Sequence, residues 1–175
     1  MSTPNPVPPS APTVDGAPAR QVFLQRLFLK DASLEMPNAP RILTVETPPA
    51  IDVQVGTGID MLASGVFQVT LQVTVTAKIN EEVAFLVEVH QAGIFQMANF
   101  ENNAELQHVL AAYCPSVILP FAREAIANLI GRTGYPPVML QPINFDALYA
   151  QHLAQHGQPQ GTDIAQPAPT TTTVQ

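Results

Sequence analysis

The chain has 175 residues, of which only 12% are charged, and its formal net charge is −7. This acidic balance argues against a nucleic-acid partner, because contacts with phosphates need clustered lysines and arginines. The length fits one domain with tails, and so little charge predicts that part of the surface is buried between subunits.

The cysteine count and the apolar runs narrow the class of protein further. The single Cys114 excludes an intramolecular disulfide and a cysteine-based zinc site. No apolar run approaches the ~20 residues needed to span a bilayer, and residues 1–20 lack the basic and apolar regions of a secretory signal. We therefore expect a cytoplasmic protein that does not insert directly into a membrane.

Both ends of the chain are predicted to be disordered. Residues 1–19 are rich in proline and have no large apolar cluster, and residues 157–175 have a similar polar composition. One folded unit is therefore expected over residues 20–156.

The folded unit begins with two expected strands. Residues 21–30 predict a strand that is apolar on both faces and so needs cover on both. Its two faces hold Phe23, Leu27 and Leu29 on one side, and Val22, Leu24 and Phe28 on the other. The proline-rich residues 36–50 follow as an extended crossing segment rather than a helix. Residues 51–55 form a second alternating strand, which Gly56 and Gly58 are expected to close.

Residues 66–95 predict a long pair of strands that are joined near residues 78–81. Odd-numbered residues are apolar from Phe67 to Ala77 and from Val83 to Val89, whereas even-numbered ones are mostly polar. Successive side chains on a strand point to opposite faces, so the odd set makes one apolar face. Leu86 is out of place on the polar face beside Glu88, which suggests a docking surface, although single exposed leucines are also common.

Two helices are expected after the strands. An apolar stripe with helical spacing runs from Leu106 to Ile130, with Asn102 or Asn103 as its cap and Gly131 at its end. Two prolines interrupt the pattern, and we interpret it as one helix with a proline break. The last helix, capped by Asn144, would bury Phe145, Leu148, Tyr149 and His152. The predicted fold is α+β: a four-stranded antiparallel sheet with two helices on one face, the first long and proline-interrupted.

Several patterns that could carry chemistry have simpler explanations. His152 and His156 have the spacing of metal ligands on a helix, but no third ligand is apparent and zinc normally takes three or four. A buried thiol is favoured over a nucleophile for Cys114, because nothing nearby would lower its pKa. The Gly56-Thr57-Gly58 sequence lacks the remainder of a phosphate-binding motif. Glu81 and Glu82 fit a solvated hairpin end. No catalytic residue, metal or cofactor is therefore expected.

Four blocks of the sequence resemble the SecB family of protein-export chaperones. They are KDASLEMPNAP (residues 30–40), VTVTAKINEEVAFLVEVHQAGIF (73–95), AAYCPSVILPFAREAIANLIGR (111–132) and PPVMLQPINFDALY (136–149). They cover nearly all of residues 20–156 in the order of the family. The resemblance implies a cytoplasmic, ATP-independent chaperone that holds precursor proteins unfolded and passes them to the translocase motor SecA. It also implies a homotetramer, built as a dimer of dimers, with the long helices between two sheet layers.

The resemblance also implies two binding surfaces. In SecB-like proteins SecA docks on an acidic outer sheet face, and the matching residues here are Asp31, Glu35, Leu86 and Glu88. Clients bind in long hydrophobic grooves between the crossing segment, the sheet and the last helix. The groove candidates are Phe28, Ile42, Leu43, Ile51, Val53 and Val55. The crossing segment RILTVETPPA has no aromatic residue where family members carry Trp, so groove specificity is expected to differ. On the residues alone, the strand candidates among them are more often ordinary sheet core than client surface.

Two other functions compete with the export role. One is a SecB-like stress or toxin–antitoxin chaperone with a dedicated client, which SecA binding would separate from an export chaperone. The other is an enzyme or a carrier of a small ligand, which needs convergent polar groups in an apolar pocket. The odd-numbered sheet face offers only apolar residues, so we expect no enzyme.

Overall fold

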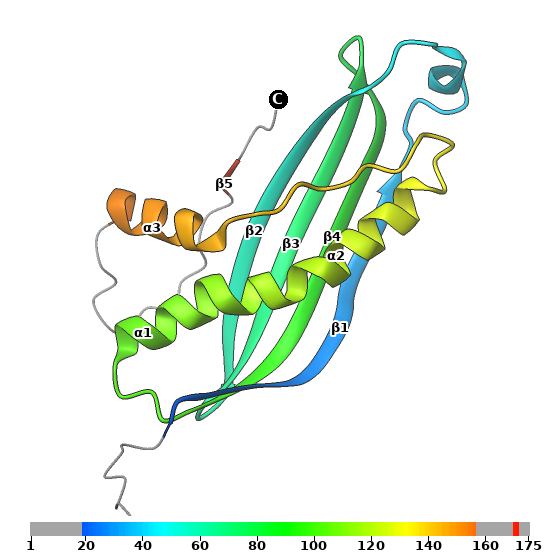
Figure 1. Cartoon of the computed structure of the whole chain (residues 1–175). Helices are drawn as coiled ribbons and strands as arrows, with labels where there is room; N and C mark the ends of the chain where they lie inside the picture. The colour runs from blue at the N-terminus through cyan, green and yellow to red at the C-terminus, as the bar shows by residue number, and fades with distance from the viewer. Residues whose placement is uncertain (1–18, 157–169, 172–175) are drawn as a thin grey trace, which may run out of the picture.

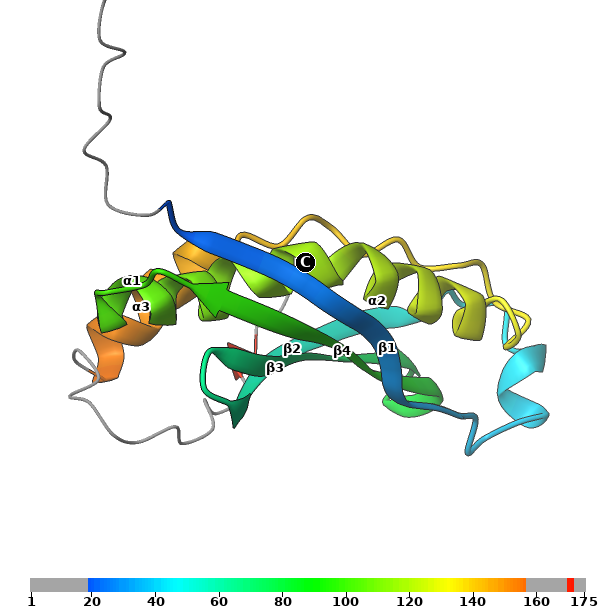
Figure 2. The same cartoon turned by 90° about the horizontal axis from the view of Figure 1, so that it is seen from below.

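A computed structural model describes residues 19–156 and 170–171 of the chain. Four long strands, β1 (Gln21–Glu35), β2 (Ala50–Ala63), β3 (Val66–Ile79) and β4 (Glu82–Ala98), form an antiparallel sheet in the order β1-β4-β3-β2. A two-residue strand, β5 (Thr170–Thr171), pairs with β2 at the edge. The helices lie on one face of the sheet (Figures 1 and 2). The predicted antiparallel sheet with helices is therefore confirmed.

Strands β3 and β4 show why the two faces of the sheet differ. On β3 the odd-numbered residues from Val69 to Ala77 have no exposed surface, and on β4 the same holds for Phe85, Val87 and Val89. The even-numbered residues between them are mostly half-buried or exposed on the outer face, away from the helices. The predicted apolar face is the inner face, and Leu86 lies half-buried on the outer one.

The turn between β3 and β4 has a form that fixes their pairing. Asn80 and Glu81 both have positive φ values, of 47° and 69°, as a two-residue hairpin turn requires. Next to the turn the register shifts, so that Val83 lies opposite Lys78 and Phe85 lies opposite Ala77. The expectation that Val83 belongs to the inner apolar face is wrong, because this bulge places it on the other face from Phe85.

Bulges also correct the predicted faces of β1. The register with β4 shifts at Gln25 and again at Lys30. An extra residue reverses the alternation that follows it. The inner face of β1 therefore holds Val22, Leu24, Leu27, Leu29 and Leu34. Phe23 and Phe28 lie on the outer face, opposite Gln96 and Ala92 of β4.

The second strand and the crossing segment also differ from prediction. β2 does not close at its glycines: Gly56 and Gly58 pair with Gln72 and Thr70, and the strand continues to Ala63. The crossing segment is not wholly irregular, because it contains one 3-10 turn, η1 (Arg41–Thr44).

The long helix is continuous where a proline break was expected. It consists of α1 (Asn103–His108), a π-helical turn η2 (Val109–Tyr113) and α2 (Cys114–Ile130), with the Asn102 side chain capping its start. The Cys114 N–H donates to the carbonyl of Val109, five residues earlier. This wider turn lies just before Pro115, which has no N–H to donate. By length and composition this helix could cross a membrane, and its buried residues, among them Ile118, Ala122 and Ile126, belong to the core of the described structure.

The last helix, α3 (Phe145–His156), is capped as predicted. The Asn144 side chain accepts a hydrogen bond of 3.0 Å from the Ala147 N–H. Phe145 is buried, but His152 is exposed and so does not belong to the expected buried stripe. The prediction of disordered ends falls outside the described residues, except at Ala19, whose carbonyl accepts a hydrogen bond from Asn99, and at Thr170–Thr171, which form β5.

Candidate functional site

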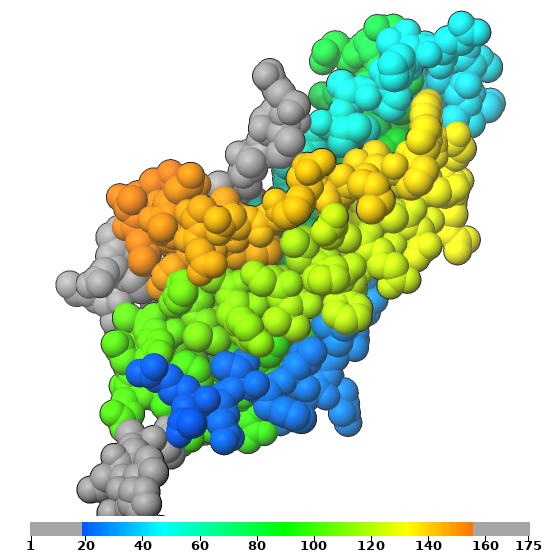
Figure 3. Space-filling view, viewed as in Figure 1, coloured from blue at the N-terminus to red at the C-terminus, as the bar shows by residue number. Residues whose placement is uncertain are grey.

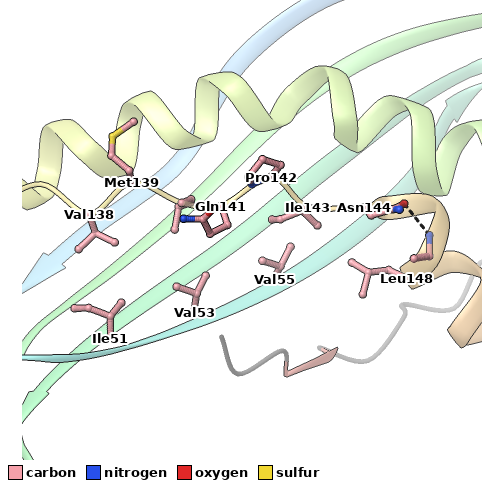
Figure 4. A pocket seen from close by; sticks show the side chains of 12 residues that line it. Ile51, Val53, Val55, Val138, Met139, Gln141, Pro142, Ile143, Asn144 and Leu148 are labelled. Carbon is pink, nitrogen blue, oxygen red and sulfur yellow. Dashed lines mark hydrogen bonds between the residues drawn. The ribbon is translucent and has the colours of Figure 1, made fainter. Parts of the chain in front are cut away.

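An apolar groove lies between the inner face of β2 and the chain that leads into α3 (Figure 4). Its cavity has a volume of about 400 Å³. One wall is formed by β2, and the other by residues 138–144 and the first turns of α3. The lining consists of Ile51, Val53, Val55, Val138, Met139, Leu140, Gln141, Pro142, Ile143, Asn144, Ala147 and Leu148.

The arrangement of the helix layer explains why this part of the sheet stays open. α2 packs mainly over β4 and β3, so the inner face of β2 is left to the extended segment 136–144 (Figures 1 and 3). That segment contains three prolines and forms neither a helix nor a strand. A single extended stretch of chain covers less of the sheet than a helix would, so part of β2 stays open. Ile51, Val53 and Val55 are consequently only half-buried.

The chemistry of the groove suits an apolar ligand. None of its lining residues is titratable, and its only polar side chains are those of Gln141 and Asn144. The Asn144 side chain is already used to cap α3. Such a surface can bind by burial of apolar area, which is not directional, but it offers no acid, base or nucleophile.

The structure separates the six groove candidates. It brings Ile51, Val53 and Val55 together in the lining. Ile42 is 1% exposed and belongs to the core, where its carbonyl accepts a 3.2 Å hydrogen bond from the Tyr135 hydroxyl. Leu43 is exposed on η1, and Phe28 lies on the outer face of the sheet, so neither lines this groove.

Sequence reasoning missed the second wall of the groove. Val138, Met139, Leu140 and Ile143 supply it, and Met139 is 69% exposed. The sequence did contain a signal for these residues. Apolar residues in an extended, proline-rich link do not belong to a helix or strand that could bury them. Such residues have to lie on a neighbouring element or remain exposed.

The outer face of the sheet carries a second candidate surface, which is acidic. In the β1–β4 pairing Glu35 lies opposite Leu86, Ser33 opposite Glu88, and Asp31 opposite His90. Directly opposed residues of antiparallel strands have their side chains on the same face. The four residues predicted for this surface, Asp31, Glu35, Leu86 and Glu88, are therefore brought together, on the face opposite the groove.

Within this acidic face, the Glu88 carboxylate has two neighbours from the sheet. Its Oε1 accepts a hydrogen bond of 2.8 Å from the Gln72 side chain and lies 2.6 Å from His90 Nε2. The side chains of Glu88 and His90 are 34% and 27% exposed. Asp31 and Glu35 are exposed, so all three carboxylates can be reached from solvent.

Metal ligands and the cysteine were the remaining candidates for chemistry. Among the side chains that the structure describes, no three His, Cys, Asp or Glu gather as metal ligands would. Cys114 is buried, and burial raises the pKa of its thiol to about 12. Its sulfur is therefore held as a neutral thiol at physiological pH.

The middle of the long helix also exposes apolar side chains to solvent. Tyr113 and Phe121 are 54% and 44% exposed, and Val117 between them is half-buried. Residues four apart lie on one side of a helix, so these three form a continuous stripe, which we call the outer helix stripe. An exposed apolar patch of this kind is typical of an interaction surface.

Comparison with known proteins gives matches to a single family. Residues 15–156 match the family model described as preprotein translocase subunit SecB. The chain is 44% identical over 136 residues to the protein-export protein SecB of Methylococcus capsulatus, covering 78% of this chain and 87% of that protein. It is 47% identical over 140 residues to the protein of the same name from Thioalkalivibrio sulfidiphilus, covering 79% and 83%.

A solved structure shows the same fold at much lower sequence identity. It is a SecB-like chaperone of Mycobacterium tuberculosis, determined in complex with a ChAD peptide from an antitoxin. The TM-score is 0.58 at 17% identity, and the match covers 70% of this chain and 90% of that one.

Proposed function

The chain belongs to the SecB family of protein-export chaperones, and we propose that it keeps precursor proteins unfolded in the cytoplasm, without ATP, and delivers them to the motor SecA. The observation that carries this proposal is the apolar groove beside β2, which has no titratable residue in its lining. A surface of this chemistry binds many apolar segments without selecting one sequence.

The groove supports the holding of unfolded chains in particular. Burial of apolar surface contributes roughly 25 cal/mol per Å², so a few client side chains in the groove would give weak binding. A client that also covers the grooves of other subunits would be held more firmly, because linked sites act at a high effective concentration. Unfolded chains expose several such segments, whereas folded proteins bury them.

The acidic outer face supports delivery to the motor. Asp31, Glu35 and Glu88 would attract a basic segment of SecA, while Leu86 would add an apolar contact. Each exposed ion pair stabilises a complex by at most about 1 kcal/mol, so several must act together. The groove and the acidic face lie on opposite faces of the sheet, which would let one subunit bind a client and SecA at the same time.

A homotetramer built as a dimer of dimers is part of the proposal. The outer helix stripe of Tyr113, Val117 and Phe121 supports it, because this apolar surface is uncovered in the single chain. Contact between the stripes of two dimers would place the long helices between two sheet layers. It would also account for the low share of charged residues in the chain.

A charge reversal on the acidic face tests the delivery step. We expect Glu88→Lys to weaken the binding of purified SecA, with a loss that shrinks as salt is added, since screening reduces the lost attraction. Glu101→Lys makes the same charge change at an exposed position before α1 and serves as the control. If Glu88→Lys bound SecA as tightly as the wild type at every salt concentration, with the same oligomeric mass, the docking assignment would be wrong.

The alternative is a SecB-like chaperone with one dedicated client. The Mycobacterium tuberculosis protein of similar fold was solved with an antitoxin peptide, so the fold can serve such a client. Export is favoured here because all four docking residues are present on one face and the more similar relatives are named protein-export proteins. Binding to SecA, measured with and without an unfolded precursor, separates the two functions.

A further inference from the structure

We propose that Gln72 and His90 are positioning residues of the acidic face, which hold Glu88 so that one of its oxygens is presented to a cationic side chain of the docking partner. The inference rests on the proposed role of this face in binding SecA. It adds two residues, one of them on β3, to a surface that otherwise consists of β1 and β4.

The three side chains are placed together by the pairing of β3 and β4. Gln72 lies directly opposite His90, and Glu88 follows two residues away on the same face of β4. Gln72 Nε2 donates to Glu88 Oε1 at 2.8 Å, and His90 Nε2 lies 2.6 Å from the same oxygen. A carboxylate can only accept hydrogen bonds, so the proton of the His90 contact belongs to Nε2 of the imidazole.

Both contacts use the same oxygen, and this leaves the other one available. Among the described residues, none donates a hydrogen bond to Glu88 Oε2. The Glu88 side chain is 34% exposed, so Oε2 can be reached by a partner. An oxygen of this kind suits a charge-assisted hydrogen bond from lysine or arginine.

The chemical nature of the two donors matters as much as their positions. A lysine or arginine at either position would neutralise Glu88, whereas the amide of Gln72 carries no charge. Holding the carboxylate in one orientation also reduces the rotational freedom that the complex must remove, which improves affinity through preorganisation. Gln72 thus defines the orientation of Glu88 without offsetting its negative charge.

The inference is tested by measuring SecA affinity for variants of the full chain. His90→Leu and Gln72→Leu each remove a donor, and we expect either to weaken SecA binding about three- to tenfold, the range of one hydrogen bond. His90→Gln keeps a side-chain N–H donor and should restore most of the affinity. In a Glu88→Gln background, His90→Leu should cause little further loss, because its effect acts through the carboxylate.

The chain offers a matched control on the same strand. Gln68 lies on the same face of β3 as Gln72 and donates to Asp60 at 3.1 Å instead of to Glu88. Gln68→Leu should therefore bind SecA like the wild type. Far-UV circular dichroism and oligomeric mass confirm that each variant compared is folded. If a leucine variant does not fold, the affinity of His90→Gln is compared with that of the wild type instead.

Two results would overturn the inference, and only one of them also contradicts the docking role of Glu88. If Glu88→Gln weakens SecA binding while His90→Leu, Gln72→Leu and His90→Gln all bind like the wild type, the positioning role is wrong and the docking face stands. If Glu88→Gln itself binds SecA like the wild type, the docking role of Glu88 fails and the positioning role fails with it.

Discussion

At the scale of single residues, Phe85 and Leu86 follow each other on β4 but lie on opposite faces of the sheet, one in the core and one on the acidic face. Phe85 has no exposed surface and its ring lies 5.7 Å from that of Tyr135, whereas Leu86 is half-buried on the outer face. Deleting a buried aromatic side chain removes its burial and leaves a cavity, but deleting a partly exposed one does neither fully. The consequence for stability can be measured.

We expect Phe85→Ala to lower the free energy of unfolding by about 3–5 kcal/mol, the usual cost of such a cavity. Leu86→Ala should lower it by no more than about 1 kcal/mol while it weakens SecA binding. Urea denaturation followed by circular dichroism gives both free energies. Equal losses for the two variants would contradict the assignment of the two faces.

Cys114 gives a second prediction at this scale. Because burial raises the pKa of its thiol to about 12, almost no thiolate is present at pH 8, and the thiolate is the reactive form. Iodoacetamide should therefore leave the native protein unmodified and label it fully in denaturant, as measured by mass spectrometry. Rapid labelling of the folded protein would show that Cys114 is accessible and ionised.

At the scale of elements, the groove depends on β2 and the extended segment 138–144 together. Val53→Asp places a carboxylate between the two walls, where desolvation would penalise its charge. We expect this variant to bind an unfolded precursor at least about tenfold more weakly and to bind SecA normally. The precursor affinity can be measured by competition with a fluorescent client peptide.

The control for this variant is the next residue of the same strand. Gln54→Asp introduces the same side chain on the outer face of β2, where Gln54 is exposed, and should leave client binding unchanged. A Val53→Asp variant that keeps its oligomeric mass and binds the precursor like the wild type would contradict the assignment of the groove.

The elements also show how far the sequence could predict the fold. The faces of β3 and most of β4 followed from alternation, because a period of two is visible in the residues themselves. The bulges at Gln25, Lys30 and Ala84 did not, because they depend on how two strands pair and leave no local pattern. The helix was expected to break at its prolines, yet a π-helical turn lets it continue.

The candidate site was predicted in part for similar reasons. The three β2 residues of the groove lie on one strand, so alternation placed them on one face. The opposite wall, residues 138–144, has no period, and its position depends on how the chain returns across the sheet. Alternation indicated a docking surface at Leu86 and Glu88, and the family resemblance added Asp31 and Glu35. Only the register of β1 with β4 shows the four residues side by side.

At the scale of the whole molecule, the outer helix stripe is the surface that needs a partner. We expect Phe121→Glu to convert the proposed tetramer into dimers, because it places a charge in an apolar contact. Met61→Glu, at an exposed position near the β2–β3 turn, should leave the tetramer intact. Light scattering measures both masses, and a Phe121→Glu variant with the mass of a tetramer would exclude this helix face as the interface.

The central claim is that the protein holds precursors unfolded without ATP, and one measurement tests it most directly. The chain has no tryptophan, so the refolding of a tryptophan-containing precursor can be followed by its own fluorescence. After dilution from denaturant, with excess protein and no nucleotide, the precursor should stay unfolded and remain able to bind SecA with the chaperone. Refolding at the same rate with and without the protein would contradict the account.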